Sequence, residues 1–199
     1  MALIIGLTGS IASGKSTVSL MFDDLNIPVV DADKVAREVV YPGEPAYEAV
    51  VKEFGEGILR KDGTLDRKHL GSIVFSNKRK LETLNGIVHP AVRKRMMEKQ
   101  EEILQQGANC VVLDIPLLYE SELTHLVDKI LVVYVDEDVQ LQRLMKRDGF
   151  TEEEAMQRIN AQFPVKKKAE LADAIINNNG DKYKSFEQLE EILKDWKII

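Results

Sequence analysis

Residues 9–17 read Gly9-Ser10-Ile11-Ala12-Ser13-Gly14-Lys15-Ser16-Thr17 and fit the pattern G-x-x-x-x-G-K-[S/T] of a phosphate-binding loop. The apolar residues 3–7 predict a buried strand before the loop, and residues 15–24 carry apolar side chains at helical spacing after it. Between a strand and a helix, such a loop points backbone N–H groups and the helix N-terminus at an anion. Lys15 can then reach the β- and γ-phosphates, and Ser16 can ligate Mg²⁺. The stretch therefore predicts a nucleoside-triphosphate site.

The composition is that of an ordinary globular chain, with 199 residues, 44% hydrophobic and 30% charged. A net charge of −6 argues against a non-specific nucleic-acid binder, which normally carries a basic surplus. The one cysteine, Cys110, borders an apolar run and is interpreted as a small buried hydrophobe, which fits a reducing compartment. No apolar run approaches the roughly 20 residues that span a bilayer, and the N-terminus lacks the basic region of a signal peptide. We expect a soluble cytoplasmic protein, a monomer or a weak homo-oligomer, without membrane or nucleic-acid partners.

Further apolar segments predict four more strands, at residues 27–30, 110–113, 129–135 and 172–176. Their alternation with helical segments predicts a three-layer α/β fold around a five-stranded parallel sheet. In such a sheet the carboxyl ends of the strands meet at the ligand edge. The polar residues that follow predicted strands include Asp31, Asp33, Asp114 and Asn178.

Each of these polar residues has a predicted role. Asp114 ends an apolar strand downstream of the loop, an arrangement in which the carboxylate faces Mg²⁺ or a metal-bound water. One of Asp31 and Asp33 caps the helix that follows, which leaves the other for function. Arg37 lies four residues after Asp33, so the two can share a helix face or form a local ion pair. The Asn178 amide could contact an adenine edge.

The chain is predicted to be a single domain, residues 1–199, with a core made of 1–32, 108–138 and 171–199. Residues 33–107 predict an inserted helical region, and its helices are expected at 46–54, 67–75, 78–88 and 91–105. His89-Pro90 is placed at the boundary between the last two helices, with Pro90 near a first helical position. In a kinase, an insertion of this kind would hold the acceptor.

Residues 139–170 predict an arginine-rich helical lid. Arg143 and Arg147 are spaced to share one helix face, Gly149 ends that helix, and Thr151 opens the next in a capping box. The arginines can close over a triphosphate or, alternatively, form surface ion pairs. The lysines at 166–168 are expected to be a solvated run.

The absence of D-x-x-G and N-K-x-D strings argues against a switch GTPase, and the organisation favours a small-molecule kinase. The chain resembles the dephospho-coenzyme A kinase family over nearly its whole length. The segments that carry the resemblance are Gly6–Gly9 leading into Ser13–Thr17, Asp31–Asp33 with Arg37, His89-Pro90, Asp114–Glu120, and Ala172-Asp173 running into Asn178 and Gly180.

The resemblance implies a three-layer P-loop kinase that uses ATP and Mg²⁺ to phosphorylate the ribose 3′-hydroxyl of dephospho-coenzyme A, the last step of coenzyme A synthesis. It implies Asp33 as the base, with Lys15 and Arg143 stabilising the transferred group. Arg147, Asn178 and the loop would contact ATP, while Ser16 and Asp114 would hold Mg²⁺. The acceptor would contact Thr8, Asp33, Arg37, His89, Leu117 and Leu118.

Two features remain open. Glycines are commoner in the family where this chain has Ser10 and Ala12, and a positive φ at either position would be strained. A kinase for another small hydroxyl or nucleotide acceptor remains the alternative activity, and a nucleotide-dependent binding module without phosphoryl transfer remains a third possibility.

Overall fold

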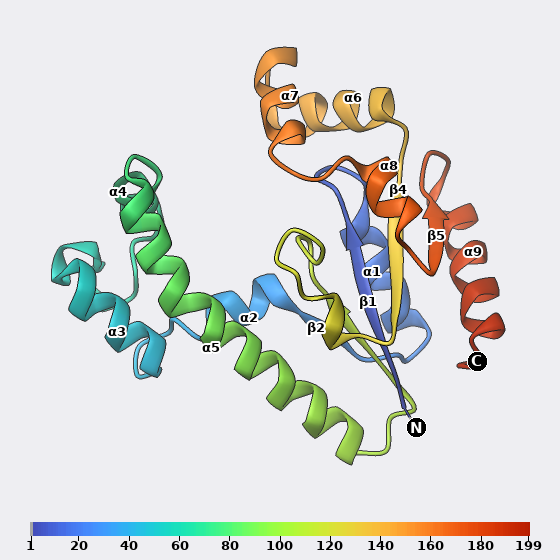
Figure 1. Cartoon of the computed structure of the whole chain (residues 1–199), viewed down its shortest axis with the longest axis horizontal. Coiled ribbons are helices and arrows are strands. Elements are labelled where there is room, and N and C mark those ends of the chain that lie inside the picture. Colours follow the sequence, from blue (N-terminus) through green and yellow to red (C-terminus); the bar gives the residue numbers. More distant parts are fainter. Residues whose placement is uncertain (1) are drawn as a thin grey trace. The chain divides into compact units, whose positions relative to one another are not determined.

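The computed structural model describes residues 2–199, and these contain a parallel five-stranded sheet (Figure 1). The strand order is β2-β3-β1-β4-β5, so the first strand lies at the centre. The strands are β1 (Leu3–Gly9), β2 (Val29–Asp31), β3 (Cys110–Asp114), β4 (Lys129–Tyr134) and β5 (Ala174–Asn177). The predicted α/β class and parallel sheet are confirmed.

Helices alternate with these strands and also fill the long segment between β2 and β3. They are α1 (Lys15–Asp24), α2 (Ala32–Glu38), α3 (Pro45–Phe54), α4 (Arg67–Phe75), α5 (Lys78–Gln105), α6 (Glu137–Asp148), α7 (Glu152–Asn160), α8 (Val165–Glu170) and α9 (Lys182–Asp195). Two short 3₁₀ helices, η1 (Glu56–Ile58) and η2 (Thr124–Leu126), complete the elements. No helix among residues 2–199 has both the length and the apolar character that a membrane crossing requires.

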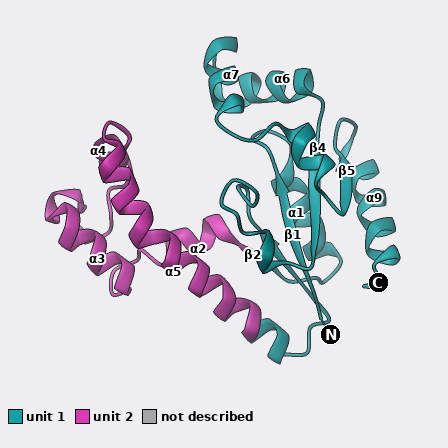
Figure 2. Cartoon of the chain, viewed as in Figure 1, with its two compact units in different colours: residues 1–30, 102–199 teal, residues 31–101 magenta. Residues whose placement is uncertain are grey.

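The chain divides into two compact units, residues 1–30 with 102–199 and residues 31–101 (Figure 2). Unit 1 contains nearly all of the sheet, and its core is built from β1, β3 and β4 with the inner faces of α1 and α9. Both faces of the central strands are covered, which explains their continuous apolar runs. Cys110 is buried in this core as predicted, and burial raises the pKa of its thiol to about 12.

Unit 2 is helical, and its centre is made by apolar side chains of α3, η1 and α4. Tyr47 is one of these residues. Its ring is buried, and its hydroxyl donates a 2.6 Å hydrogen bond to the Gly63 carbonyl. Leu59 and Leu65 pair through a short antiparallel bridge.

The division of residues 1–199 into core, insertion and lid stays a prediction.

Local sequence signals placed several helix ends correctly. Asp31 caps α2 by accepting hydrogen bonds from the N–H groups of Asp33 and Lys34, and Gly149 ends α6 with a φ of 71°. Thr151 and Glu154 form the expected capping box of α7.

The predicted break at His89-Pro90 is wrong, because α5 runs through both residues without interruption. A proline inside a helix removes one N–H donor, and its ring crowds the carbonyl four residues earlier. That earlier residue is Gly86, which has open space around the position of a β-carbon. We attribute the tolerance of Pro90 to this glycine, whose backbone can adjust without side-chain conflict.

Candidate active site

The phosphate loop connects β1 to α1, and two of its glycines are required by space. A β-carbon on Gly9 would lie 2.6 Å from Oγ of Ser13 and 3.0 Å from the carbonyl oxygen of Val133. One on Gly14 would collide with Nδ2 of Asn178, and Gly14 also has a φ of 87°. The loop is therefore held closely by its neighbours in the sheet.

Asn178 follows β5, and its side chain holds the phosphate loop by a hydrogen bond. Its buried side chain donates a 2.8 Å hydrogen bond from Nδ2 to the Ser13 carbonyl, while its Oδ1 accepts one of 2.7 Å from Ser185. Both ends of the amide thus have protein partners. The expected contact with an adenine edge stays a prediction.

The outer part of the loop is tied to the predicted lid. Ile11 is bound on both sides, since its N–H donates to Gln162 Oε1 and its carbonyl accepts from Gln140 Nε2, each at 2.8 Å. The Ser10 hydroxyl donates to the Phe163 carbonyl at 3.3 Å. These contacts were not predicted, although buried Gln140 lies four residues before buried Leu144 and so on the same helix face.

The two non-glycine positions of the loop differ in strain. Ala12 has a φ of 60°, in the left-handed region, and Ser10 is not among the positive-φ residues. The left-handed conformation costs a non-glycine residue roughly 1–2 kcal/mol. The strain considered for both positions therefore falls on Ala12 alone.

Lys15 and Asp114 meet at the carboxyl edge of the sheet. The Lys15 ammonium forms an ion pair with Oδ1 of Asp114, whose carboxylate is almost fully buried. The fully buried Thr8 follows Leu7, the β1 residue paired with Asp114, and its hydroxyl donates a 3.0 Å hydrogen bond to the Pro116 carbonyl. The structure thus brings together the residues expected at the phosphates and the metal.

Lys168 corrects the expectation of a solvated lysine run at 166–168. Its side chain is fully buried, and Nζ lies 2.8 Å from Glu120 Oε1 and 3.3 Å from the carbonyl oxygens of Gly9 and Pro116. Glu120 Oε1 also accepts the N–H of Phe163 at 3.0 Å. The signal that was missed is helical spacing, because Lys168 follows buried Val165 by three residues on the same face of α8.

The two lid arginines have different surroundings. Nη1 of Arg143 lies 3.9 Å from the position that a β-carbon on Gly14 would take, so its guanidinium stands beside the loop. Within residues 2–199, Arg143 is absent from the ion pairs and side-chain hydrogen bonds, whereas Arg147 forms a bidentate pair with Asp148 at 2.8 and 2.9 Å. This pair raises the pKa of Arg147 chiefly through hydrogen bonding. The charge of Arg143 is therefore available to an anion, whereas the charge of Arg147 is already paired with that of Asp148.

The loop residues fit a polyphosphate. Oγ of Ser13 is buried without a hydrogen-bond partner, and an unpaired buried hydroxyl is costly unless a ligand satisfies it. With Lys15 and the unpaired Arg143, the loop offers donors and positive charge at one place.

The residues at the same edge also fit a magnesium ion. Mg²⁺ usually takes only one or two protein carboxylates besides waters and phosphate oxygens. Exposed Ser16 and buried Asp114 can supply that small set, and a larger group of carboxylate, His or Cys ligands is absent from residues 2–199.

The predicted acceptor residues of unit 2 are on its surface. Asp33 lies exposed in the first turn of α2, and Arg37 lies exposed in its last turn. The suggested ion pair between them is absent from the pairs of the described chain. His89 is exposed in the middle of α5, and its pKa is lowered by partial desolvation and then by the charge of Arg93.

The two leucines expected at the acceptor belong to unit 1 and differ in exposure. Leu117 is 41% exposed, whereas Leu118 is fully buried against the backbone of Gly6. Only Leu117 presents a surface in this structure. The assignments of both residues, like the other site assignments, stay predictions.

Known proteins share both the sequence and the fold of this chain. Residues 3–184 match the family model described as dephospho-CoA kinase. The chain is 58% identical over 199 residues to the dephospho-CoA kinase of Geobacillus kaustophilus, covering 100% of this chain and 99% of the relative. It is 56% identical to that of Bacillus cereus strain ATCC 10987, with 100% of both chains covered.

Solved structures agree with these relatives. A Thermus thermophilus protein superposes with a TM-score of 0.82 at 34% identity, covering 98% of this chain and 97% of its own. Dephospho-CoA kinase from Campylobacter jejuni superposes with a TM-score of 0.76 at 30% identity, covering 98% of each chain. A family model matched over most of the chain and relatives matched over their full length lead to one conclusion: this chain belongs to the dephospho-CoA kinase family.

Proposed function

We propose that this chain transfers the γ-phosphoryl group of ATP to the ribose 3′-hydroxyl of dephospho-coenzyme A and releases coenzyme A and ADP. The observation that carries the proposal is the phosphate loop with Lys15, Asp114 and Arg143 at its mouth, in a chain that is 58% identical to a dephospho-CoA kinase over its full length. The proposed reaction is the final step of coenzyme A synthesis, and we place it in the cytoplasm and in a monomer or weak homo-oligomer.

Phosphoryl transfer depends mainly on positioning and on stabilising charge. Lys15 is paired with Asp114, and it exchanges that partner for the β- and γ-phosphates when the triphosphate enters the loop. Asp114 and Ser16 would hold Mg²⁺ at this edge of the sheet. The metal supplies charge neutralisation on the phosphate oxygens. Arg143 adds a cation at the loop, and the N–H groups of residues 10–16 hold the phosphates.

Asp33 is the proposed base for the acceptor hydroxyl. Asp31 is committed to capping α2, whereas the carboxylate of Asp33 is exposed and has no hydrogen-bond partner within residues 2–199. Asp33 follows the end of β2 by two residues. It accepts the 3′-hydroxyl proton as that oxygen bonds to phosphorus, and ADP leaves. Arg37, His89, Thr8 and the two leucines are proposed to contact the acceptor, and Arg147 and Asn178 are proposed to contact ATP.

A coupled assay of ADP release tests the reaction. The acceptors are dephospho-coenzyme A, pantothenate, AMP, CMP and shikimate, and ³¹P NMR locates the new phosphate. We expect ADP release with dephospho-coenzyme A alone and a new 3′-phosphomonoester, and Lys15→Ala should abolish both. Faster release with another acceptor would establish the alternative kinase activity. ADP release that no acceptor stimulates would leave only a nucleotide-dependent binding module.

A further inference from the structure

Unit 2 contains a polar surface pocket of about 270 Å³ that the described site does not use. It opens beside the short turn between η1 and α4. Its lining residues are Val40, Tyr41, Pro42, Arg60, Asp62, Thr64, Leu65 and Arg67. The pocket therefore carries two guanidinium groups and one carboxylate.

The local fold fixes the positions of the two arginines. Arg60 and Thr64 close a tight turn, since the Arg60 N–H donates to the Thr64 carbonyl at 2.8 Å and the Gly63 N–H donates to the Arg60 carbonyl at 3.0 Å. Arg67 begins α4 directly after its cap, Asp66. Nη2 of Arg67 donates to the Arg37 carbonyl at 3.4 Å, which brings the last turn of α2 to the same place.

The carboxylate of the pocket is already occupied. Oδ1 of Asp62 accepts hydrogen bonds from the N–H and the hydroxyl of Thr64, at 3.0 and 2.7 Å. These bonds hold the pKa of Asp62 below its usual value. Neither this carboxylate nor another one forms an ion pair with Arg37, Arg60 or Arg67 within residues 2–199.

None of the three arginines forms an ion pair in the described part of the chain, although the charge of Arg60 also acts on the carboxylates of Asp62 and Asp66. Partial desolvation lowers the pKa of Arg67, and the positive charges of Arg37 and Arg60 lower it further. An anion in the pocket would relieve the repulsion that Asp62 and Asp66 leave uncompensated.

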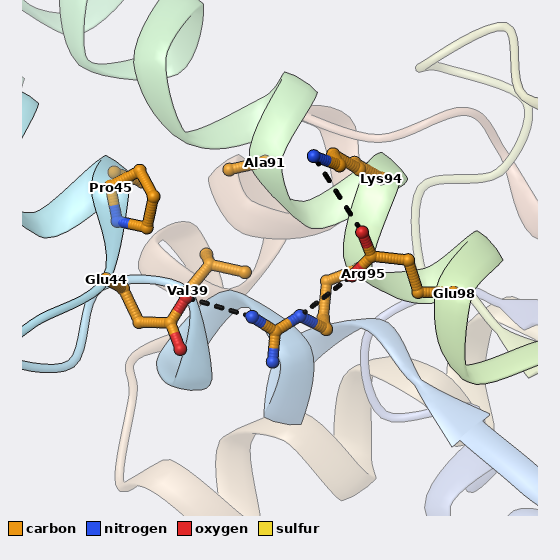
Figure 3. Close-up of a pocket in the computed structure, with 8 residues that line it drawn as sticks. Val39, Glu44, Pro45, Ala91, Lys94, Arg95 and Glu98 are labelled. Atoms are coloured by element: carbon orange, nitrogen blue, oxygen red, sulfur yellow. Dashed lines mark hydrogen bonds and ion pairs between the residues drawn. The ribbon is translucent and has the colours of Figure 1, made fainter. Parts of the chain in front are cut away.

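Another pocket of unit 2 provides a contrast. Figure 3 shows that its cations point at carboxylates of the same pocket. Arg95 pairs with Glu44 at 2.9 Å and with Glu98 at 3.2 Å, and Lys94 also faces Glu98 at 3.8 Å. The cations of that pocket form ion pairs, whereas Arg60 and Arg67 form none within residues 2–199.

We propose that Arg60 and Arg67, together with Arg37, bind the diphosphate group of the acceptor in the pocket beside the turn at residues 60–67. This inference rests on the proposed function, because dephospho-coenzyme A carries a diphosphate ester. Guanidinium groups match phosphate oxygens in a bidentate geometry that ammonium groups do not offer. Tyr41 adds a hydroxyl donor to the lining, and its exposed ring leaves that hydroxyl reachable.

The test separates acceptor binding from ATP binding in four full-length variants, Arg60→Gln, Arg67→Gln, Arg67→Lys and Arg79→Gln. Arg79 is the matched control, because it is an exposed arginine of the same unit that does not line the pocket. We expect Arg60→Gln and Arg67→Gln each to raise the KM for dephospho-coenzyme A about tenfold or more, while kcat and the KM for ATP change less than about threefold. Arg67→Lys should also raise the KM for dephospho-coenzyme A, but by less than Arg67→Gln does. Arg79→Gln should have the KM of the wild type.

Calorimetric titration with dephospho-coenzyme A in the absence of ATP should give the same order of affinities. The inference is wrong if the wild type phosphorylates dephospho-coenzyme A and both glutamine variants behave like Arg79→Gln. It is equally wrong if the KM for ATP rises as much as the KM for the acceptor. If Arg67→Gln does not fold, Arg60→Gln decides the question, because the Arg60 side chain forms no hydrogen bond or ion pair within residues 2–199. A wild type without acceptor-dependent ADP release would instead contradict the proposed function itself.

Discussion

The ammonium group of Lys168 lies 2.8 Å from Oε1 of Glu120, and the Lys168 side chain is fully buried. The pair joins three segments that are distant in sequence, since the same ammonium reaches the carbonyl of Gly9 in the phosphate loop and that of Pro116 after β3. Glu120 in turn holds the N–H of Phe163, whose carbonyl accepts from Ser10. The C-terminal part of the predicted lid and the loop are therefore connected through one ion pair whose cation is fully buried.

Removing the cation of this pair should destabilise the protein strongly. Lys168→Met leaves Glu120 as a largely buried carboxylate, 16% exposed, without a counter-charge, so we expect the free energy of unfolding to fall by about 3 kcal/mol. Urea denaturation measures the change. Lys166→Met, at an exposed position of the same helix, is the control and should cost less than about 0.5 kcal/mol. The double variant Lys168→Met/Glu120→Gln should recover part of the loss, and a purely additive result would argue against a coupled pair.

Replacing the proposed base should reduce turnover without loss of nucleotide affinity. Asp33→Asn is nearly isosteric, and we expect kcat to fall on the order of 10²-fold or more while the Kd for ATP is unchanged. Steady-state kinetics and a nucleotide-binding titration measure the two quantities. Asp31→Asn is the control, because Asp31 serves the α2 cap. A variant Asp33→Asn with near wild-type kcat would remove Asp33 from the mechanism.

The two lid arginines should differ in their contribution to kcat. Arg143 stands unpaired beside the loop, so Arg143→Ala should lower kcat by about 10²-fold and change the Kd for ATP much less. Arg147 is paired with Asp148 at the surface, so Arg147→Ala should lower kcat less than tenfold. Equal losses in the two variants would mean that Arg147 leaves Asp148 when ATP binds.

Two glycines with positive φ distinguish backbone strain from a steric conflict. Gly43 has a φ of 93° and open space around it, so Gly43→Ala should cost only the strain of about 1–2 kcal/mol. Gly14→Ala should cost about 3 kcal/mol or more, because its methyl group also displaces the Asn178 amide. Thermal and urea denaturation compare the variants. Gly14→Ala should also lose ATP binding, and equal costs at the two positions would refute the collision.

The start of β5 should contribute a pH-dependent term to stability. Asp173 accepts hydrogen bonds from Lys129 Nζ at 2.9 Å and from the Ile130 N–H at 2.8 Å. Burial raises the pKa of Asp173, but these bonds and the Lys129 charge outweigh it and hold that pKa below 3.8. Its stabilisation is therefore complete above pH 3.8 and is lost as the pH falls further.

The difference in unfolding free energy between wild type and Asp173→Asn should accordingly shrink below that pH. Denaturation curves recorded at several pH values measure it. A difference that stays constant on acidification would show that ionisation of Asp173 does not stabilise the folded state.

Much of the sheet and of the loop was predictable because their signals are local. Continuous apolar runs identified the strands to within a few residues, and the glycine and lysine spacing identified residues 9–16. The caps formed by Asp31 and Thr151 were equally readable, since a capping side chain bonds to N–H groups two or three residues away. The resemblance to the family came from short segments of the same kind.

Other features depend on residues that meet only after the chain has folded. Lys168, Gln140 and Asn178 each contact a loop residue that lies between 129 and 165 positions earlier in the sequence. The residues next to them in the sequence say little about these contacts. Pro90 was misjudged because the usual helix-breaking rule overlooks the glycine that tolerates it. Residue spacing thus predicted the phosphate-binding chemistry of the loop. Long-range packing alone decided which charges are buried, which arginines are left unpaired and how the loop is held, because those properties belong to pairs of distant residues.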